Sequence, residues 1–206
     1  MNKLTRRAFG VAGLALMLAT SASYAQQPQR IRIRGDIVKA DGDVFDIKTR
    51  GGEAVKVKLV DPGRVVAMVK ASLADIKVGS YIGVTAMPQA DGSQKAIGIH
   101  IFMESQRGVA EGFQPWDREP NSTMTNAAVA SSVASVDGQV IMVKYKDGEK
   151  KVIVPPNCPI VAYTPGNKDE LKTGAHIFIV AAIKQPDGSL TTQAISVGRD
   201  GVVPPM

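Results

Sequence analysis

Apolar and polar residues alternate along most of the chain that follows residue 30. Residues 55–59, for example, read Val-Lys-Val-Lys-Leu, and alternation with a period of two is typical of a β-strand with one buried face. The same pattern predicts that this strand covers 55–60 and that further strands cover 44–49, 81–87, 95–102, 140–145, 151–154, 176–183 and 191–197. We therefore expect an all-β protein.

An opening strand precedes these and has two distinct faces. Ile31, Ile33 and Ile37 mark its apolar side. Three arginines, Arg30, Arg32 and Arg34, occupy the alternate positions and are expected on the opposite face.

Turn residues separate the predicted strands. Asp-Gly at 147–148 between two alternating runs is a strong hairpin signal, because glycine reaches positive φ without steric cost. Residues 72–79 predict a short helical turn, with Ser72 able to cap its start and Gly79 able to end it in a left-handed conformation.

The strand and turn pattern occurs twice, at a constant offset of 96 residues. This offset separates Asp41 from Asp137, Glu53 from Glu149, and Asp91 from Asp187. Three strands, a helical turn and two further strands form the order of an OB-like barrel. We therefore predict two tandem OB-like modules of about five strands each, over 30–104 and 131–199. A β-sandwich built from the same strands is the alternative.

Residues 105–130 have no counterpart in either predicted module and are interpreted as a linker. They contain the only tryptophan, Trp116, whose large apolar ring is costly to leave in water. We expect Trp116 to pack between the modules. Residues 200–206 are interpreted as a C-terminal tail.

The N-terminus has the pattern of a cleavable export signal. Lys3, Arg6 and Arg7 precede an apolar run over 8–19, and Ser23-Tyr24-Ala25 supplies small residues for cleavage after residue 25. The run is short for a membrane span, so we expect a periplasmic protein with no transmembrane segment in the mature chain. Residues 5–9 resemble a twin-arginine signal, and an ordinary secretory signal is the alternative.

Charge and cysteine content narrow the possible partners. Residues 1–25 hold three basic and no acidic side chains, which leaves 22 basic against 19 acidic residues in the mature chain, a net charge of +3. This charge is compatible with binding to an anionic envelope surface, whereas nucleic acid is not expected as a partner in the periplasm.

The lone Cys158 has no internal disulfide partner, and we interpret it as a small packed residue rather than a reactive thiol.

The two repeats, the run Met-Thr-Asn-Ala at 124–127 and the ending Gly-Val-Val-Pro-Pro-Met at 201–206 carry a family resemblance. The chain resembles exported proteobacterial proteins with tandem OB-like domains of unknown function, over nearly the whole mature chain. The resemblance implies a fold and a compartment. It implies no catalytic or ligand residues.

No catalytic motif is present in the sequence: it has no Gly-x-Ser-x-Gly, His-Glu-x-x-His, Cys-x-x-Cys or phosphate loop. We therefore predict no catalytic residues and no cofactor, with a hydrolase as a distant alternative. Neither His100 nor His176 recurs in the other repeat.

Binding of a soft metal such as cuprous copper is a more specific alternative, because thioether and imidazole groups are suitable ligands for it. The candidate ligands are Met87, His100, Met103 and Met124.

An interaction surface is the remaining hypothesis. Lysines on predicted outward faces could attract an anionic envelope polymer, since OB-like surfaces often bind oligosaccharides or oligonucleotides. A solvated lysine face that protects strand edges is the alternative. The candidate interaction residues are Trp116, Lys56, Lys58, Lys144 and Lys146. The leading expectation is a non-catalytic binding protein whose partner is an envelope protein or polymer, and the oligomeric state stays open.

Overall fold

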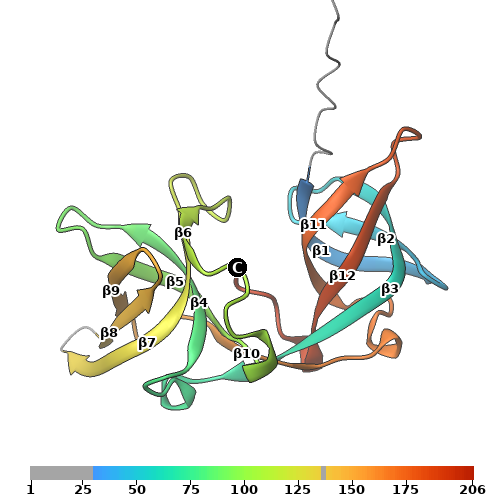
Figure 1. Cartoon of the computed structure of the whole chain (residues 1–206). Helices are drawn as coiled ribbons and strands as arrows, with labels where there is room; N and C mark the ends of the chain where they lie inside the picture. Colours follow the sequence, from blue (N-terminus) through green and yellow to red (C-terminus); the bar gives the residue numbers. More distant parts are fainter. Residues whose placement is uncertain (1–29, 136–137) are drawn as a thin grey trace, which may run out of the picture.

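The computed structural model describes residues 30–135 and 138–206, so the predicted signal peptide lies outside the described residues. The described chain is all-β, with three short 3-10 turns between strands and a fourth after the last strand. Its strands form one continuous network of hydrogen-bonded pairs that closes on itself in two places, which gives the two lobes of Figure 1.

The first barrel is a closed ring of five strands. Neighbours pair in an antiparallel sense except for β3 and β12, which are parallel. Its strands are β1 (Arg30–Asp41), β2 (Val44–Thr49), β3 (Ala54–Ala71), β11 (His176–Lys184) and β12 (Leu190–Gly198). The closure removes the open edges that a sandwich of these strands would keep.

The second barrel repeats this arrangement with a shorter closure. Here β5 and β9 form the parallel pair, through only two residue pairs, and the other neighbours are antiparallel. Its strands are β4 (Tyr81–Pro88), β5 (Gln94–Ile101), β7 (Thr123–Ser135), β8 (Gly138–Tyr145) and β9 (Gly148–Val154).

The pairings differ from the two consecutive modules predicted over 30–104 and 131–199. Each barrel takes three strands from one repeat and two strands from the other. Figure 1 shows this directly, because blue and cyan strands lie beside orange and red strands in one barrel. We call this arrangement the strand exchange.

A long strand carries the chain from one barrel to the other. β3 runs for 18 residues, although the sequence pattern predicted a strand that ends at residue 60. Its second part contains Val-Val-Ala-Met at 65–68, all of which are buried. An uninterrupted apolar run is typical of a strand covered on both faces, and this run pairs with β12 on one side and β10 (Ile160–Pro165) on the other.

The chain returns to the first barrel through β10, which pairs antiparallel with β3 and parallel with β5. The 3-10 turn η3 (Lys168–Glu170) follows it and leads into β11. In the other repeat, η1 (Leu73–Asp75) connects β3 to β4 in the same way. The helical turn predicted over 72–79 is shorter than expected, because η1 ends at Asp75 and is followed by Ile76 in an extended conformation. Gly79 lies beyond it at a φ of +88°, a left-handed conformation that favours glycine.

The predicted linker over 105–130 holds regular structure. η2 (Glu104–Gln106) and β6 (Gly112–Pro115) lie in it, and β6 pairs with β7. The first part of β7 also falls in this range. Residues 126–135 lie 96 positions after 30–39, so β7 is the repeat equivalent of β1 and the second unit begins earlier than predicted.

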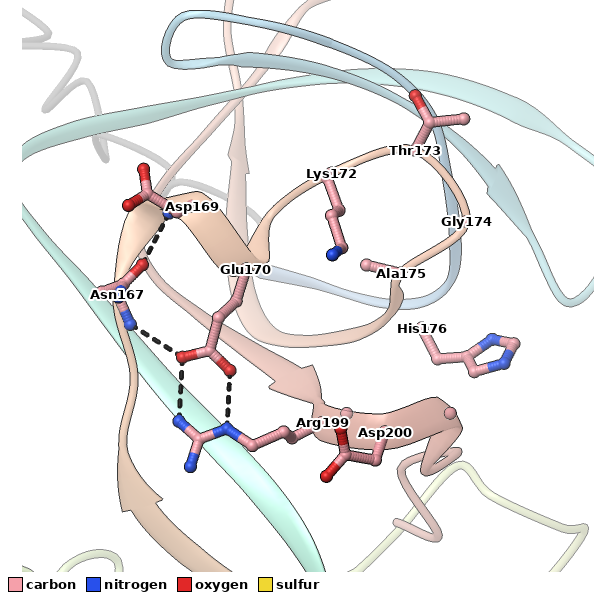
Figure 2. Close-up of a pocket in the computed structure, with 12 residues that line it drawn as sticks. Asn167, Asp169, Glu170, Lys172, Thr173, Gly174, Ala175, His176, Arg199 and Asp200 are labelled. Atoms are coloured by element: carbon pink, nitrogen blue, oxygen red, sulfur yellow. Dashed lines mark hydrogen bonds and ion pairs between the residues drawn. The ribbon is translucent and has the colours of Figure 1, made fainter.

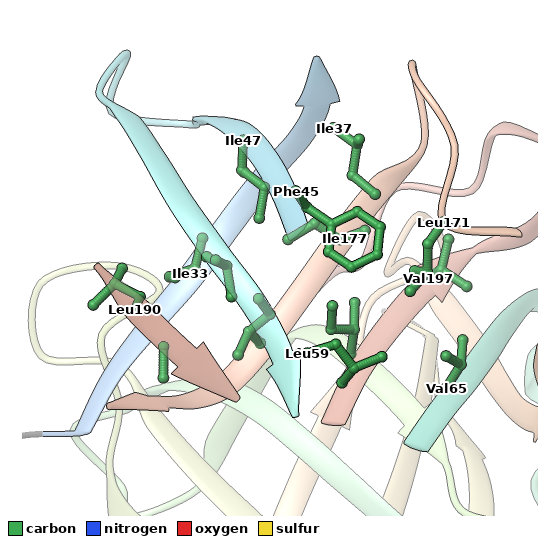
Figure 3. Packing of buried hydrophobic residues seen from close by; sticks show 14 of the residues in the cluster. Ile33, Ile37, Phe45, Ile47, Leu59, Val65, Leu171, Ile177, Leu190 and Val197 are labelled. Atoms are coloured by element: carbon green, nitrogen blue, oxygen red, sulfur yellow. The ribbon is translucent and has the colours of Figure 1, made fainter. Parts of the chain in front are cut away.

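Each barrel has its own apolar core. Figure 3 shows the first core, where Phe45 and Ile47 of one repeat pack with Ile177 of the other. The second core likewise joins Ile82 and Ile99 to Ile141. A third cluster lies between the barrels and contains Met68, Trp116, Met124, Val161, Phe178 and Met206. Residues of the predicted tail therefore pack into the fold.

The strand exchange predicts that the two barrels unfold together. Ile177 and Ile141 are both fully buried, one in each barrel. We expect Ile177→Ala or Ile141→Ala to lower the free energy of unfolding by about 2–5 kcal/mol, and each should shift one common transition. Calorimetry and circular dichroism of the variants measure this.

The exposed Val180, also on β11, provides the matched control. Val180→Ala should leave the transition nearly unchanged. Two separate transitions, each sensitive to only one of the buried substitutions, would contradict a fold in which both barrels share strands of both repeats.

Candidate functional site

His100, the first of the predicted metal ligands, is buried against aromatic rings. Its ring stacks on Tyr163 with centroids 5.1 Å apart and meets the edge of Phe102 at 4.6 Å. Burial lowers the pKa of His100 to about 3, so the imidazole is neutral at neutral pH. Gly83 lies opposite His100 on β4. A side chain at Gly83 would collide with the imidazole.

The three predicted methionine ligands lie in different surroundings. Met124 is buried in the third cluster, Met87 is half-buried near the end of β4, and Met103 is half-buried before η2. Within the described ranges, no three residues of the types His, Cys, Asp and Glu gather as a metal site. The copper hypothesis stays a prediction.

The predicted lysine surface is exposed but divided between the barrels. Lys56 and Lys58 lie on β3, whereas Lys144 lies on β8 and Lys146 in the turn that follows it. Lys56 lies 3.6 Å from a carboxylate oxygen of Asp46. These lysines are solvent-exposed as expected, and they belong to two separate faces.

Trp116 packs in the third cluster, between the barrels. Its residue is 9% exposed, and its ring meets Phe178 of β11 at a centroid distance of 6.5 Å. The guanidinium carbon of Arg32 lies 3.9 Å above the centroid of the indole. This cation–π contact joins the opening strand to the segment between the repeats.

The arginines of the opening strand form one wall of a pocket of about 330 Å³. We call it the arginine pocket. Arg32 and Arg34 come from β1, Arg50 comes from the β2–β3 turn, and Arg118 comes from the segment after Trp116. Thr49, Glu53 and Asp117 also line it. The site thus combines the first repeat with the segment between the repeats.

Positive charge exceeds negative charge in this pocket. Asp117 accepts a hydrogen bond from Arg34 at 2.7 Å and lies 3.6 Å from Arg32. Arg118 pairs with Glu119 at 2.8 Å. Arg50 makes no ion pair among the described residues and donates to the main-chain oxygen of Pro204 at 2.7 Å. One lining carboxylate therefore serves two arginines.

Crowding of the guanidinium groups affects their protonation equilibria. Burial lowers the pKa of Arg50, and the positive charges of Arg118 and Arg34 lower it further. Burial would raise the pKa of Asp117, but the hydrogen bond and charge of Arg34 and the charge of Arg32 outweigh it, so the net pKa is lowered. Asp117 stays ionised, and the arginines still repel one another.

Two guanidinium N–H groups at this site have no partner in the described protein. They are the Nε groups of Arg32 and Arg118, both shielded from solvent. A buried donor without an acceptor costs about 1–3 kcal/mol. An anionic ligand would compensate the positive charge of these arginines, because a guanidinium fork matches the oxygens of carboxylate and phosphate.

A second pocket, of about 450 Å³, lies between η3 and the 3-10 turn η4 (Arg199–Gly201) and is shown in Figure 2. Its charges are largely compensated. Both carboxylate oxygens of Glu170 accept hydrogen bonds from Arg199 at 2.9 Å, and His176 contacts Asp36 at 2.5 Å. These pairs hold the connection from β10 to β11 in place. We therefore assign the charged residues of this pocket a structural role.

Cys158 agrees with its interpretation as a packed residue. It is half-buried against the core of the second barrel. Burial raises the pKa of its thiol to about 12, so the thiolate required for nucleophilic attack is scarce at neutral pH.

The arginine pocket was only partly predictable from the sequence. Period-two spacing placed Arg32 and Arg34 on one face of the opening strand. Arg118 carried no signal, because no local pattern brings residues 117–118 to β1.

No family model, curated protein or solved structure matches the chain. Among the described residues, no helix has the length and apolar character needed to cross a membrane.

The burial of His100 predicts a pH-dependent stability. The pKa of His100 is lower in the folded protein than its ordinary value of 6.5, so the unfolded chain takes up a proton that the folded protein excludes. Stability is therefore fully present above pH 6.5. It is lost as the pH falls from 6.5 towards 3, by about 1.4 kcal/mol per pH unit.

Urea unfolding at pH 7 and pH 4.5 tests this expectation. His100→Gln should reduce the loss of stability between the two pH values, because the substituted residue takes up no proton. Val180→Ala, at an exposed position with no titrating group, is the control and should show the same loss as the wild type. An equal loss in the wild-type protein and in His100→Gln would show that burial of His100 does not set the pH dependence.

Proposed function

We propose that this chain is an exported, non-catalytic binding protein that takes an anionic ligand at the arginine pocket. The single observation that carries the proposal is the gathering of Arg32, Arg34, Arg50 and Arg118 around one cavity with Asp117 and Glu53 as its lining carboxylates. Such a site offers positive charge and directed hydrogen-bond donors to an anionic group.

Barrel topology supports an OB-like interpretation of each unit. The two exchanged strands follow the other three in the chain in the first barrel and precede them in the second, as β4 and β5. In both barrels, one repeat supplies three antiparallel strands; the third of these pairs in parallel with one exchanged strand, and the first pairs with the other. This is the pairing order of the OB fold, a binding scaffold for oligosaccharides and oligonucleotides. The proposal differs from tandem OB-like modules only in that the last two strands are exchanged between repeats.

The expected compartment limits the choice of ligand. The N-terminal pattern over 1–25 supports export to the periplasm, and the mature chain has a mild positive charge. Acidic groups of envelope polymers or envelope proteins are the anions available there. The proposed ligand group is therefore a carboxylate or a phosphate carried by such a partner.

All residues that line the arginine pocket come from the first repeat or from the segment after β6. At the offset of 96 residues, Arg32 and Arg34 correspond to Ala128 and Ala130, and Arg50 corresponds to Lys146. The second repeat therefore lacks the opposed guanidinium groups. This asymmetry is expected where a duplication preserves a fold and only one copy acquires a site.

Isothermal titration with inorganic phosphate tests the proposal. Arg50→Ala should weaken binding about tenfold, because it removes a charge-assisted hydrogen-bond donor. Arg50→Lys should weaken binding less, since it keeps the charge and loses the fork. Binding should also weaken at higher salt.

Lys48→Ala is the matched control, because Lys48 is an exposed basic residue of β2 that does not line the pocket. Its affinity for phosphate should equal that of the wild type. Equal affinities in wild type and Arg50→Ala would rule out the arginine pocket as the anion site.

A further inference from the structure

The arginine pocket continues into a neighbouring pocket of about 310 Å³. Both pockets are lined by Arg32, Ile33, Thr49 and Glu53. Together they form a groove that crosses β1 and the β2–β3 turn and reaches the β11–β12 turn. We call the added part the side groove.

The side groove has a different character from the arginine pocket. Its apolar lining comes from Ile31, Val55 and Leu190. Lys56 and Lys184 are exposed basic residues on the same lining. A ligand that fills both parts therefore needs an acidic group, an aliphatic surface and further polar groups beyond it.

We infer that the ligand is an acidic oligosaccharide, with an acid group in the arginine pocket and adjacent sugar units in the side groove. This inference rests on the proposed function. A sugar ring presents C–H groups on its faces and hydroxyl groups at its edges, which suits aliphatic residues beside lysine, threonine and glutamate. An acyl chain would leave these polar groups without partners.

Charge along the groove favours a chain with repeated acid groups. Lys56 and Lys184 extend the positive charge of the arginines towards the β11–β12 turn. Trp116 is buried under Arg32 and offers no exposed platform for a sugar. Binding through aliphatic contacts and charge is expected to depend on the acid groups of the ligand and on salt.

The test compares two probes on the full mature chain by isothermal titration. One is a tetrasaccharide of 1,4-linked uronic acid units, and the other is inorganic phosphate. The double variant Lys56→Ala with Lys184→Ala should bind the tetrasaccharide about tenfold more weakly and bind phosphate as the wild type does. Lys58→Ala, an exposed position on β3 outside the groove, is the control and should leave both affinities unchanged.

Other outcomes separate this inference from the proposed function. If phosphate binds through Arg50 but the tetrasaccharide does not compete with it, the oligosaccharide inference is wrong and the anion site stands. Equal binding of the carboxyl-reduced tetrasaccharide would overturn the role of the acid groups. Binding to phosphatidylglycerol vesicles in place of the tetrasaccharide would identify a lipid surface and overturn the inference. If Arg50→Ala binds both phosphate and the tetrasaccharide as tightly as the wild type does, both proposals are wrong.

Discussion

The strand exchange is the constraint on which the rest of this structure depends. β1 closes its barrel by pairing with β11, about 140 residues later in the chain, and β4 pairs with β7 of the other repeat. Neither repeat completes a barrel from its own strands. The backbone hydrogen bonds and both apolar cores therefore require the two repeats together.

The strand exchange requires two strands, β3 and β10, to cross between the barrels, and the pairing of these strands stabilises the connection. The apolar part of β3 and β10 pair with each other between the barrels, so the crossing segments satisfy their main-chain groups without a long loop. The third cluster then fills the space beside them with side chains from both barrels and from the end of the chain. Trp116 belongs to that cluster, and its position brings residues 117–118 to β1. The arginine pocket is thus a consequence of how the barrels are joined.

Local sequence patterns predicted the strands but could not predict which copy each strand joins. The two repeats share the same alternation, so β1 has equally suitable partners in β4 and β11. The run at 65–68 indicates that β3 continues beyond its hairpin with β2. A strand that is apolar at consecutive positions is typically covered on both faces. The offset of 96 also relates residues 126–135 to residues 30–39, and this relation identifies β7 as the repeat of β1.

The candidate site was predictable only where it depends on local periodicity. Arg32 and Arg34 share a face because a strand alternates, whereas their contact with Arg118 and Asp117 depends on the packing of Trp116. The lysines singled out from the pattern are exposed, yet the exchange distributes them over two barrels. His100 was noticed for its chemistry, and its aromatic surroundings follow from the approach of β10 to β5.

The most direct test of the strand exchange is the set of backbone NOEs of the isotopically labelled mature protein. Cross-strand NOEs should connect Ile33 with Ile179 and Gly35 with Ile177, which are paired residues of β1 and β11. NOEs from these β1 residues to β4 instead would show that each repeat closes its own barrel, and would contradict the strand exchange.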